Sequence, residues 1–241
     1  MYWYGYCGGI FGKTHGSVDI VHSHNEGTVS ATVTDSYCYV GGRIGRAEGE
    51  LKVRTSYNSA GLNYNNNSDT SSLVGGLVSE VSGCVAEFTD SYSSGVITVL
   101  VSTTYTTVKI GGIVGEAKSS SKVTLTRCYT ACRIKTSETV IMQMAGLVVF
   151  NTGNSTLSMN NCLTDCSYTY NAQSINVNAL TFGAATIYNC YSTYKGVTTG
   201  QAHSCFISDM SRASFYTDTL RWSETVWDLS GLSSTNYPKL K

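Results

Sequence analysis

Nine cysteines are the most reactive side chains in this sequence, and five of them occupy repeated positions. Two positions, four residues apart, hold these five: Cys128, Cys162 and Cys190 at the first, Cys132 and Cys166 at the second. Earlier copies of the second position carry glycine or alanine, which indicates a tight inward site where a free thiol packs as a small apolar group. Disulfides between neighbours are the alternative in an oxidising compartment. Zinc is not expected, because its structural sites usually carry C-x2-C pairs.

The histidines and carboxylates do not form a recognisable reactive group. His22 and His24 lie two residues apart and would share one face of a strand, but a surface pair of this kind is commonly inert. Cleavage of a polysaccharide needs two carboxylates that face each other. Asp90 and Asp165 come nearest to such a pair, yet they fall at different points of the repeat. We therefore predict no metal ligand, no cofactor and no catalytic residue, and we expect that the chain is not an enzyme.

A sequence repeat of about 34 residues recurs along the chain, and its most visible feature is a pair of glycines followed by apolar residues. The second glycine marks the structural repeat and stands at Gly9, Gly42, Gly76, Gly112 and Gly146. A faded sixth copy follows at Asn178. Repeats of about 20 to 50 residues are typical of solenoids, in which each repeat buries its apolar face against its neighbours.

Each repeat also contains two apolar positions separated by one residue, which is polar in most copies. The first position holds Val18, Leu51, Ala86, Val123 and Leu157. The second position holds Ile20, Val53, Phe88, Leu125 and Met159. This alternation is the pattern of a β-strand with one buried face. We therefore predict that the two sets form two core columns, each passing through successive repeats.

Two further apolar runs complete each repeat. One contains Val29, Leu62, Ile97, Ile134 and Tyr168. The other follows the glycine pair, with Ile10, Ile44, Leu77, Ile113 and Leu147, assigned to within one residue. The sequence thus predicts an all-β fold: a right-handed, single-stranded parallel β-helix of about six coils with three short strands each. An antiparallel sandwich or barrel is the alternative, but it gives no reason for whole phrases to repeat in register.

The period fades toward the C-terminus, and we predict a repeat domain over residues 1–207 followed by a capping segment of the same domain over 208–241. The residues expected to cover the last coil and end strand pairing are Trp222, Trp227, Tyr237 and Pro238. The alternative for these rings is an aromatic platform that binds sugar.

The composition limits the classes of partner. Sixteen basic and sixteen acidic residues balance, so nothing favours nucleic acid or an anionic membrane. No apolar run approaches the ~18 residues that a transmembrane helix requires. The first residues, MYWYGYCGG, already enter a coil and carry no visible signal peptide. We therefore expect the chain to be part of a longer secreted protein.

The glycine phrase resembles the GLUG-motif repeat of bacterial surface and secreted proteins, which include adhesin-like proteins and some immunoglobulin A peptidases. Three copies keep both glycines of the motif: Gly9-Ile10-Phe11-Gly12, Gly42-Arg43-Ile44-Gly45 and Gly112-Ile113-Val114-Gly115. The resemblance covers residues 7–200 or so, and it implies an extracellular, non-catalytic repeat region. No active site is carried over, because the catalytic part of such peptidases lies elsewhere.

Together these observations predict a non-catalytic binding or scaffold module outside the cell or on its surface, either an adhesin-like stalk or a structural subunit of a surface assembly. The partners expected are a glycan or a protein ligand at a surface, or copies of the chain joined end to end. Two alternatives remain. One is a carbohydrate-active β-helix enzyme, a tailspike-like polysaccharide lyase or hydrolase; the other is a subunit of a self-polymerising extracellular filament.

Overall fold

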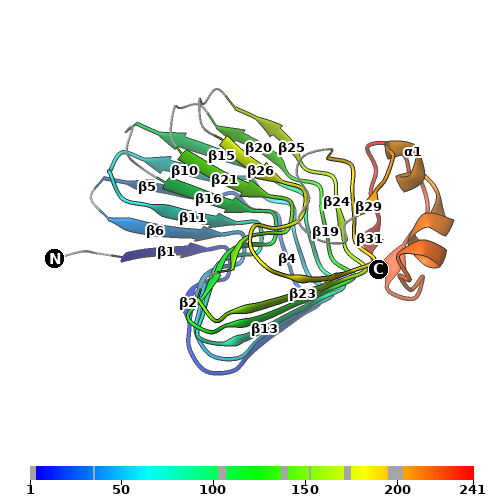
Figure 1. The fold of residues 1–241 in the computed structure, drawn as a ribbon, viewed down its shortest axis with the longest axis horizontal. Coiled ribbons are helices and arrows are strands. Elements are labelled where there is room, and N and C mark those ends of the chain that lie inside the picture. Colours follow the sequence, from blue (N-terminus) through cyan, green and yellow to red (C-terminus); the bar gives the residue numbers. More distant parts are fainter. Residues whose placement is uncertain are drawn as a thin grey trace.

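A computed structural model describes residues 4–34, 36–102, 107–136, 141–151, 153–170, 175–194 and 203–241. In these ranges the repeats form a β-solenoid, because strands of successive repeats pair in parallel and stack into five long sheets (Figure 1). The predicted all-β solenoid is confirmed. The solenoid has about five turns rather than six, since two of the five sheets already end at the fifth turn.

Each turn contributes five strands, not the three predicted. We name each sheet after its first strand. The β1 sheet contains β1 (Tyr4–Gly8), β6 (Tyr37–Gly41), β11 (Ser72–Gly75), β16 (Thr107–Gly111), β21 (Ile141–Ala145) and β26 (Ile175–Asn178). The β2 sheet contains β2 (Phe11–Thr14), β7 (Ile44–Ala47), β12 (Val78–Ser82), β17 (Val114–Lys118) and β22 (Val148–Asn151). The β3 sheet contains β3 (Val18–Val21), β8 (Leu51–Arg54), β13 (Val85–Thr89), β18 (Lys122–Thr126), β23 (Thr156–Asn160) and β27 (Thr186–Tyr188).

Two more sheets complete the turn. The β4 sheet consists of two-residue strands: β4 (His24–Asn25), β9 (Tyr57–Asn58), β14 (Tyr92–Ser93), β19 (Tyr129–Thr130), β24 (Leu163–Thr164), β28 (Tyr191–Ser192) and β29 (His203–Ser204). The β5 sheet contains β5 (Val29–Val33), β10 (Leu62–Asn66), β15 (Val96–Val101), β20 (Arg133–Thr136) and β25 (Ser167–Thr169). Strands of two residues are too short to produce a periodic pattern in the sequence. This explains part of the difference between the five strands in each turn and the three predicted.

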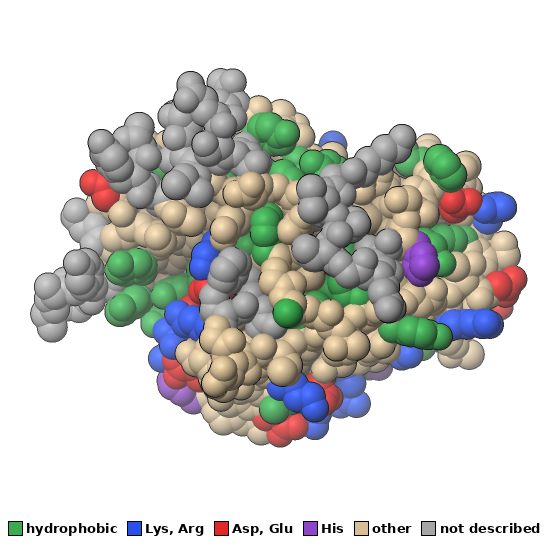
Figure 2. Space-filling model, in the orientation of Figure 1, with side chains coloured by type: hydrophobic (Ala, Val, Ile, Leu, Met, Phe, Trp, Pro, Cys, Tyr) green, Lys and Arg blue, Asp and Glu red, His purple; other side chains and the backbone are tan. Residues whose placement is uncertain are grey.

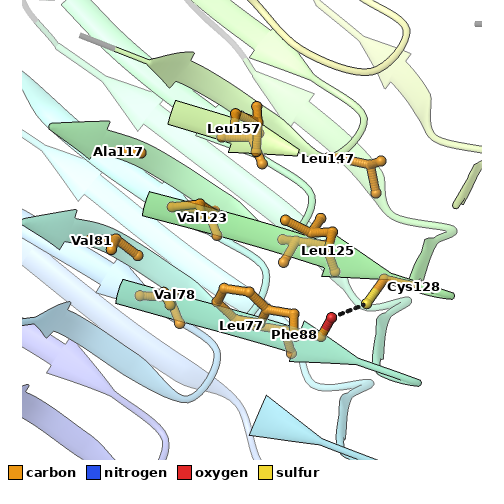
Figure 3. Close-up of a cluster of buried hydrophobic side chains, with 14 of the residues drawn as sticks. Leu77, Val78, Val81, Phe88, Ala117, Val123, Leu125, Cys128, Leu147 and Leu157 are labelled. Atoms are coloured by element: carbon orange, nitrogen blue, oxygen red, sulfur yellow. Dashed lines mark hydrogen bonds between the residues drawn. The ribbon is translucent and has the colours of Figure 1, made fainter. Parts of the chain in front are cut away.

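The β3 sheet carries the two sets of alternating apolar residues in register. Ile20 pairs with Val53, Val53 with Phe88, Phe88 with Leu125 and Leu125 with Met159. The set Val18, Leu51, Ala86, Val123 and Leu157 forms the neighbouring column. Figure 3 shows Phe88, Val123, Leu125 and Leu157 pointing into one apolar cluster. Burial of these columns stabilises the stack, at about 25 cal/mol per Å² of apolar surface.

The core is divided into two apolar compartments by a line of close backbone contacts. One compartment lies between the β2 and β3 sheets and the other between the β1 and β5 sheets. At the division, the second glycine of each pair faces an inward side chain of the β4 sheet. A Cβ on Gly112 would lie 2.0 Å from the carbonyl oxygen of Gly146 and 2.7 Å from Thr130 Cγ2. Gly9, Gly42, Gly76 and Gly146 meet the same kind of obstruction, so the repeated glycine marks a position without room for a side chain.

The apolar run after the glycine pair, which the sequence assigned to within one residue, is shifted by one residue in its second copy. Ile44 pairs with Phe11 and Val78 in the β2 sheet. Arg43 instead occupies the inward column, since its backbone amide donates to the carbonyl of Leu77. Its side chain is fully buried, and it donates through Nη1 to the carbonyl oxygens of Ser23 (2.7 Å) and Tyr57 (2.6 Å). An arginine in this column interrupts the apolar pattern that the prediction followed.

The C-terminal segment (residues 207–241) lies beside the stack, next to β24 and β29, in Figure 1. It contains α1 (Ile207–Met210), a π-helical turn η1 (Phe215–Thr219), and an antiparallel pair, β30 (Trp227–Asp228) and β31 (Lys239–Leu240). The residues predicted to cap the last coil, Trp222, Trp227, Tyr237 and Pro238, belong to this segment and lie along the side of the stack. The rings of this segment pack on the outer face of the β4 sheet, because that face presents aromatic residues in several turns.

The surface drawn in Figure 2 is mostly polar and uncharged, with charged side chains more numerous along its lower border. Within the described ranges, no helix has the length and apolar character needed to cross a membrane.

Candidate ligand-binding groove

A ladder of aromatic rings follows the outer face of the β4 sheet. His24, Tyr57, Tyr92 and Tyr129 occupy one register position in four successive turns. Their ring centroids are 5.1, 4.7 and 4.6 Å apart in that order, with interplanar angles of 9°, 3° and 11°. We call these four residues the tyrosine ladder. Stacked aromatic pairs contribute roughly 0.5–1.5 kcal/mol each beyond their area burial, so the ladder holds neighbouring turns in register.

A sharp corner before each short strand directs the ladder outward. The residue at the corner has a positive φ in six turns, between 45° and 55°: His22, Thr55, Asp90, Arg127, Asn161 and Asn189. This conformation is uncommon outside glycine. The serine or cysteine that follows stabilises the corner by donating to the carbonyl two residues back, as Ser56 does to Arg54 at 2.8 Å. The ladder residue comes next and faces outward.

The cysteine column at Cys128, Cys162 and Cys190 occupies the position of this corner serine. Cys128 Sγ donates to the carbonyls of Phe88 (3.5 Å, Figure 3) and Thr126 (3.4 Å), which makes it a substitute for the serine hydroxyl. Cys132 and Cys166 are buried in the other compartment. All nine cysteines are free thiols, eight of them buried, and burial raises the pKa of Cys162 well above its usual range. The thiols here pack and donate weak hydrogen bonds.

The C-terminal segment is fixed to the ladder by side-chain hydrogen bonds. Trp227 Nε1 donates to Asp90 Oδ1 at 3.1 Å, and Trp222 Nε1 donates to the carbonyl of Asn161 at 2.8 Å. The Tyr129 hydroxyl donates to the carbonyl of Pro238 at 2.8 Å. The segment therefore buries Tyr92 and Tyr129 on the outer face of the β4 sheet, whereas Tyr57 is only partly buried against it.

A groove of about 310 Å³ lies where this cover ends. The solenoid contributes Glu26, Tyr57, Ser59, Tyr92, Ser94 and Tyr129 to its lining. The C-terminal segment contributes residues 235–237 and Lys239. Ser59 and Glu26 are exposed, and the Tyr57 hydroxyl donates to Glu26 Oε1 at 2.9 Å.

The phenols of the groove stay protonated at neutral pH. Burial, and secondarily the hydrogen bond to Glu26, raise the pKa of Tyr57. Burial likewise raises the pKa of Tyr92 and, more strongly, that of Tyr129. A neutral phenol both donates and accepts hydrogen bonds. The groove therefore offers several hydroxyl groups and a single carboxylate to a ligand.

Stacking of sugar on the predicted aromatic platform is ruled out for both tryptophans. Trp222 is 3% exposed and Trp227 is completely buried. The inner rings of the ladder are also covered on both faces, since Tyr57 stacks between His24 and Tyr92. A ligand in the groove meets ring edges and hydroxyl groups instead.

The predicted histidine pair is split by the corner. His22 occupies the corner itself, with φ 46°, whereas His24 begins the ladder. Asp90 and Asp165 also lie apart, at different register positions: Asp90 binds Arg127 and Trp227, and Asp165 accepts the Tyr237 hydroxyl at 2.5 Å. Among the residues that the structure describes, no group of three or more His, Cys, Asp and Glu side chains is arranged to hold a metal ion.

One carboxylate pair on adjacent turns was missed in the sequence. Glu80 and Glu116 are register partners in the β2 sheet. Lys118 lies 2.6 Å and Arg46 2.9 Å from Glu80, and Lys109 lies 2.7 Å from Glu116. Burial raises the pKa of Glu80, whose side chain has no exposed surface. Sealed between cations, Glu80 links adjacent turns but offers no access to a substrate.

Comparison with known proteins found no matching family model, no matching curated protein and no matching solved structure. The groove residues Glu26, Ser59 and Ser94 share one signal in the sequence: each lies two residues after a ladder position.

Proposed function

We propose that the chain is a non-catalytic binding and scaffold module that acts outside the cell, as an adhesin-like stalk or a structural subunit of a surface assembly. The observation that carries this proposal is the open groove on the side of a stack whose turns are joined by continuous parallel pairing. The stack provides a rigid support, and the groove provides hydroxyl groups and one carboxylate to a glycan or protein ligand. A rigid support for side chains lowers the entropy cost of binding.

The proposal includes the right-handed sense of winding and membership of the GLUG-motif class. Right-handed winding is supported by the strong preference for right-handed connections between parallel strands of one sheet. The extracellular location is supported by the resemblance of the glycine phrases to that motif. The absence of catalysis is supported by the sealed environment of Glu80, which argues against the carbohydrate-active enzyme that the sequence left as an alternative.

A variant that fills the groove tests this function whatever the ligand is. Ser59→Trp places an indole at a residue that lines the groove, and Ser167→Trp, at an exposed position of β25, is the matched control. Both variants and the wild type are applied to arrays of immobilised glycans and surface proteins. We expect saturable binding that is lost in Ser59→Trp and kept in Ser167→Trp. Absence of binding by the wild type, or equal binding by all three chains, contradicts the proposal.

End-to-end self-association is a second candidate, favoured by the edge of the first turn. Each of β1 to β5 has a single hydrogen-bonded neighbour among the described strands. Ile10 and Phe11 are each 40% exposed there, whereas Ile44, one turn further on, is fully buried. Unpaired strand edges invite pairing with another chain. Light scattering across a hundredfold range of concentration decides this point: growth of the particle mass supports self-association, and a constant monomer mass rejects it.

A further inference from the structure

We propose that the groove binds a neutral, hydroxyl-rich glycan, with the Glu26 carboxylate as the main acceptor and the hydroxyl groups of Tyr57 and Ser59 as its neighbours. This inference rests on the proposed binding function and names the ligand class and the residues that recognise it.

A hydrogen bond within the chain itself resembles the contact proposed between Glu26 and a sugar hydroxyl. The position two residues after each ladder residue holds Glu26, Ser59, Ser94 and Ala131 in the first four turns, and Asp165 aligns with it in the fifth turn. Backbone hydrogen bonds between successive turns fix this alignment. In the fifth turn, Asp165 Oδ2 accepts a hydrogen bond of 2.5 Å from the Tyr237 hydroxyl, whose ring lies 6.1 Å from Tyr129. At this position an acid therefore accepts a hydrogen bond from a hydroxyl group of the C-terminal segment.

In the first turn the same position is open. Glu26 is exposed, and one of its oxygens accepts from Tyr57, while the second has no hydrogen-bond partner in the part of the chain that is described. Ser59 and Ser94 continue the row through the next two turns at the strand spacing of about 4.8 Å. The row provides an acceptor followed by groups that both donate and accept, which suits the hydroxyl groups of a sugar chain.

The observations favour a glycan over a peptide strand. The backbone of the β4 sheet is already paired on both sides: Tyr92 N donates to the carbonyl of Ser56, and Tyr129 N donates to that of Ser91. In these turns the β4 sheet therefore offers no free edge, and strand addition needs one. The faces of the inner ladder rings, Tyr57 and Tyr92, are covered as well, so an aromatic side chain cannot stack on them. Glu26 and Lys239 balance in charge, so a neutral ligand is preferred to an anionic one.

Isothermal titration with neutral hexasaccharides of β-glucan, mannan, xylan and chitin tests the inference. We expect at least one of the four to bind with a dissociation constant below about 1 mM. Glu26→Gln keeps the shape of the side chain but removes its charge, and it should weaken that binding about tenfold. Tyr57→Phe keeps the stacked ring but removes the hydroxyl group, and it should weaken binding several-fold. Glu87→Gln, at an exposed site of β13, is the control and should bind as the wild type does.

The outcomes separate this inference from the proposed function. If no hexasaccharide binds, or if Glu26→Gln and Tyr57→Phe bind as tightly as the wild type, the glycan assignment is wrong. In that case, the array is used to look for a protein ligand. If a protein on the array binds and Ser59→Trp abolishes that binding, the groove remains a binding site, with a peptide segment as its ligand. Loss of array binding altogether removes both proposals. Thermal unfolding of each variant, expected within about 2 °C of the wild type because the changed groups are surface groups, verifies that the variants are folded.

Discussion

Asp90 and Trp227 are 137 residues apart in the sequence and joined by a buried hydrogen bond of 3.1 Å from the indole Nε1 to the carboxylate. Asp90 also occupies a sharp corner of the third turn and binds Arg127 of the fourth turn through two hydrogen bonds of 2.7 Å. The Asp90 carboxylate therefore binds both a neighbouring turn of the solenoid and the C-terminal segment. The C-terminal segment in turn contributes residues 235–237 and Lys239 to the groove.

Trp227→Phe removes the indole donor to Asp90 and part of the packing around it. We expect a loss of about 2 kcal/mol in the free energy of unfolding. The C-terminal segment should also become cleavable at low protease concentrations that leave the wild type intact. Denaturant unfolding and limited proteolysis measure the two effects, with Thr225→Ala at a nearby exposed site as the control. An unchanged cleavage pattern contradicts the role given to this hydrogen bond.

Gly112→Ala tests the close approach that divides the core. The added Cβ would lie 2.0 Å from the carbonyl oxygen of Gly146, so neighbouring turns must move apart. We expect a loss of about 3 kcal/mol in the free energy of unfolding. At Gly5 the nearest atom to an added Cβ lies at 3.6 Å, which makes Gly5→Ala the matched control. Equal unfolding midpoints for the two variants would show that the second glycine is not required by lack of space.

Arg43→Leu restores the apolar column that arginine interrupts. The Nε and Nη2 atoms of Arg43 are buried without a hydrogen-bond partner, and burial lowers the pKa of its guanidinium to about 10. Replacing a buried charge by an apolar side chain of suitable size is often stabilising, so we expect a gain of about 1 kcal/mol or more. Arg54→Leu, at an exposed position, is the comparison. A less stable Arg43→Leu would mean that the two hydrogen bonds of Nη1 outweigh the cost of the buried charge.

Cys7 is the half-buried thiol of the nine, and it should react first with an alkylating reagent. A hydrogen bond from Cys38 lowers the pKa of Cys7 from 9.0 to about 6. Its thiolate is therefore formed as the pH rises through about 6, and the alkylation rate should increase there rather than near 9. The same shift adds stability as the pH rises from about 6 to 9, because the unfolded thiol binds more protons over that range. Mass spectrometry of protein alkylated between pH 5 and 9 measures the rate, with Cys7→Ser as the control; a midpoint near 9 contradicts the contact with Cys38.

A full count of thiols tests the state of the other cysteines. Unfolded protein that has not been reduced should bind nine equivalents of a thiol reagent. Two equivalents fewer for each bridge would show that stacked cysteines are oxidised in the protein as isolated.

The parts of the fold that repeat could be predicted from the sequence. Ile20, Val53 and Phe88 stand 11, 11 and 12 residues after the second glycine of their pairs and alternate with outward residues, so the strand and its stacking are visible together. The strands of the β4 sheet are only two residues long, which leaves no alternation to detect. Arg43 was overlooked for a different reason, because a buried charge contradicts the apolar pattern used to find the column.

The site was harder to predict than the fold, because it depends on features that occur once. The C-terminal segment has no second copy in the chain, so its lateral position on the ladder could not be inferred from the repeat. Glu26 differs from Ser59 and Ser94 at the same register position and therefore did not stand out as a member of one row. Glu80 and Glu116 were not predicted as a pair, because residues 36 positions apart become neighbours only when the strands of the β2 sheet are aligned in register.

A crystal structure of the chain with a bound neutral hexasaccharide tests the central claim most directly. The account predicts sugar density between the edges of Tyr57 and Tyr92 and residues 235–239, with a sugar hydroxyl within hydrogen-bond distance of Glu26. Sugar bound elsewhere, or a crystal in which His24, Tyr57, Tyr92 and Tyr129 do not stack in one row, would contradict it.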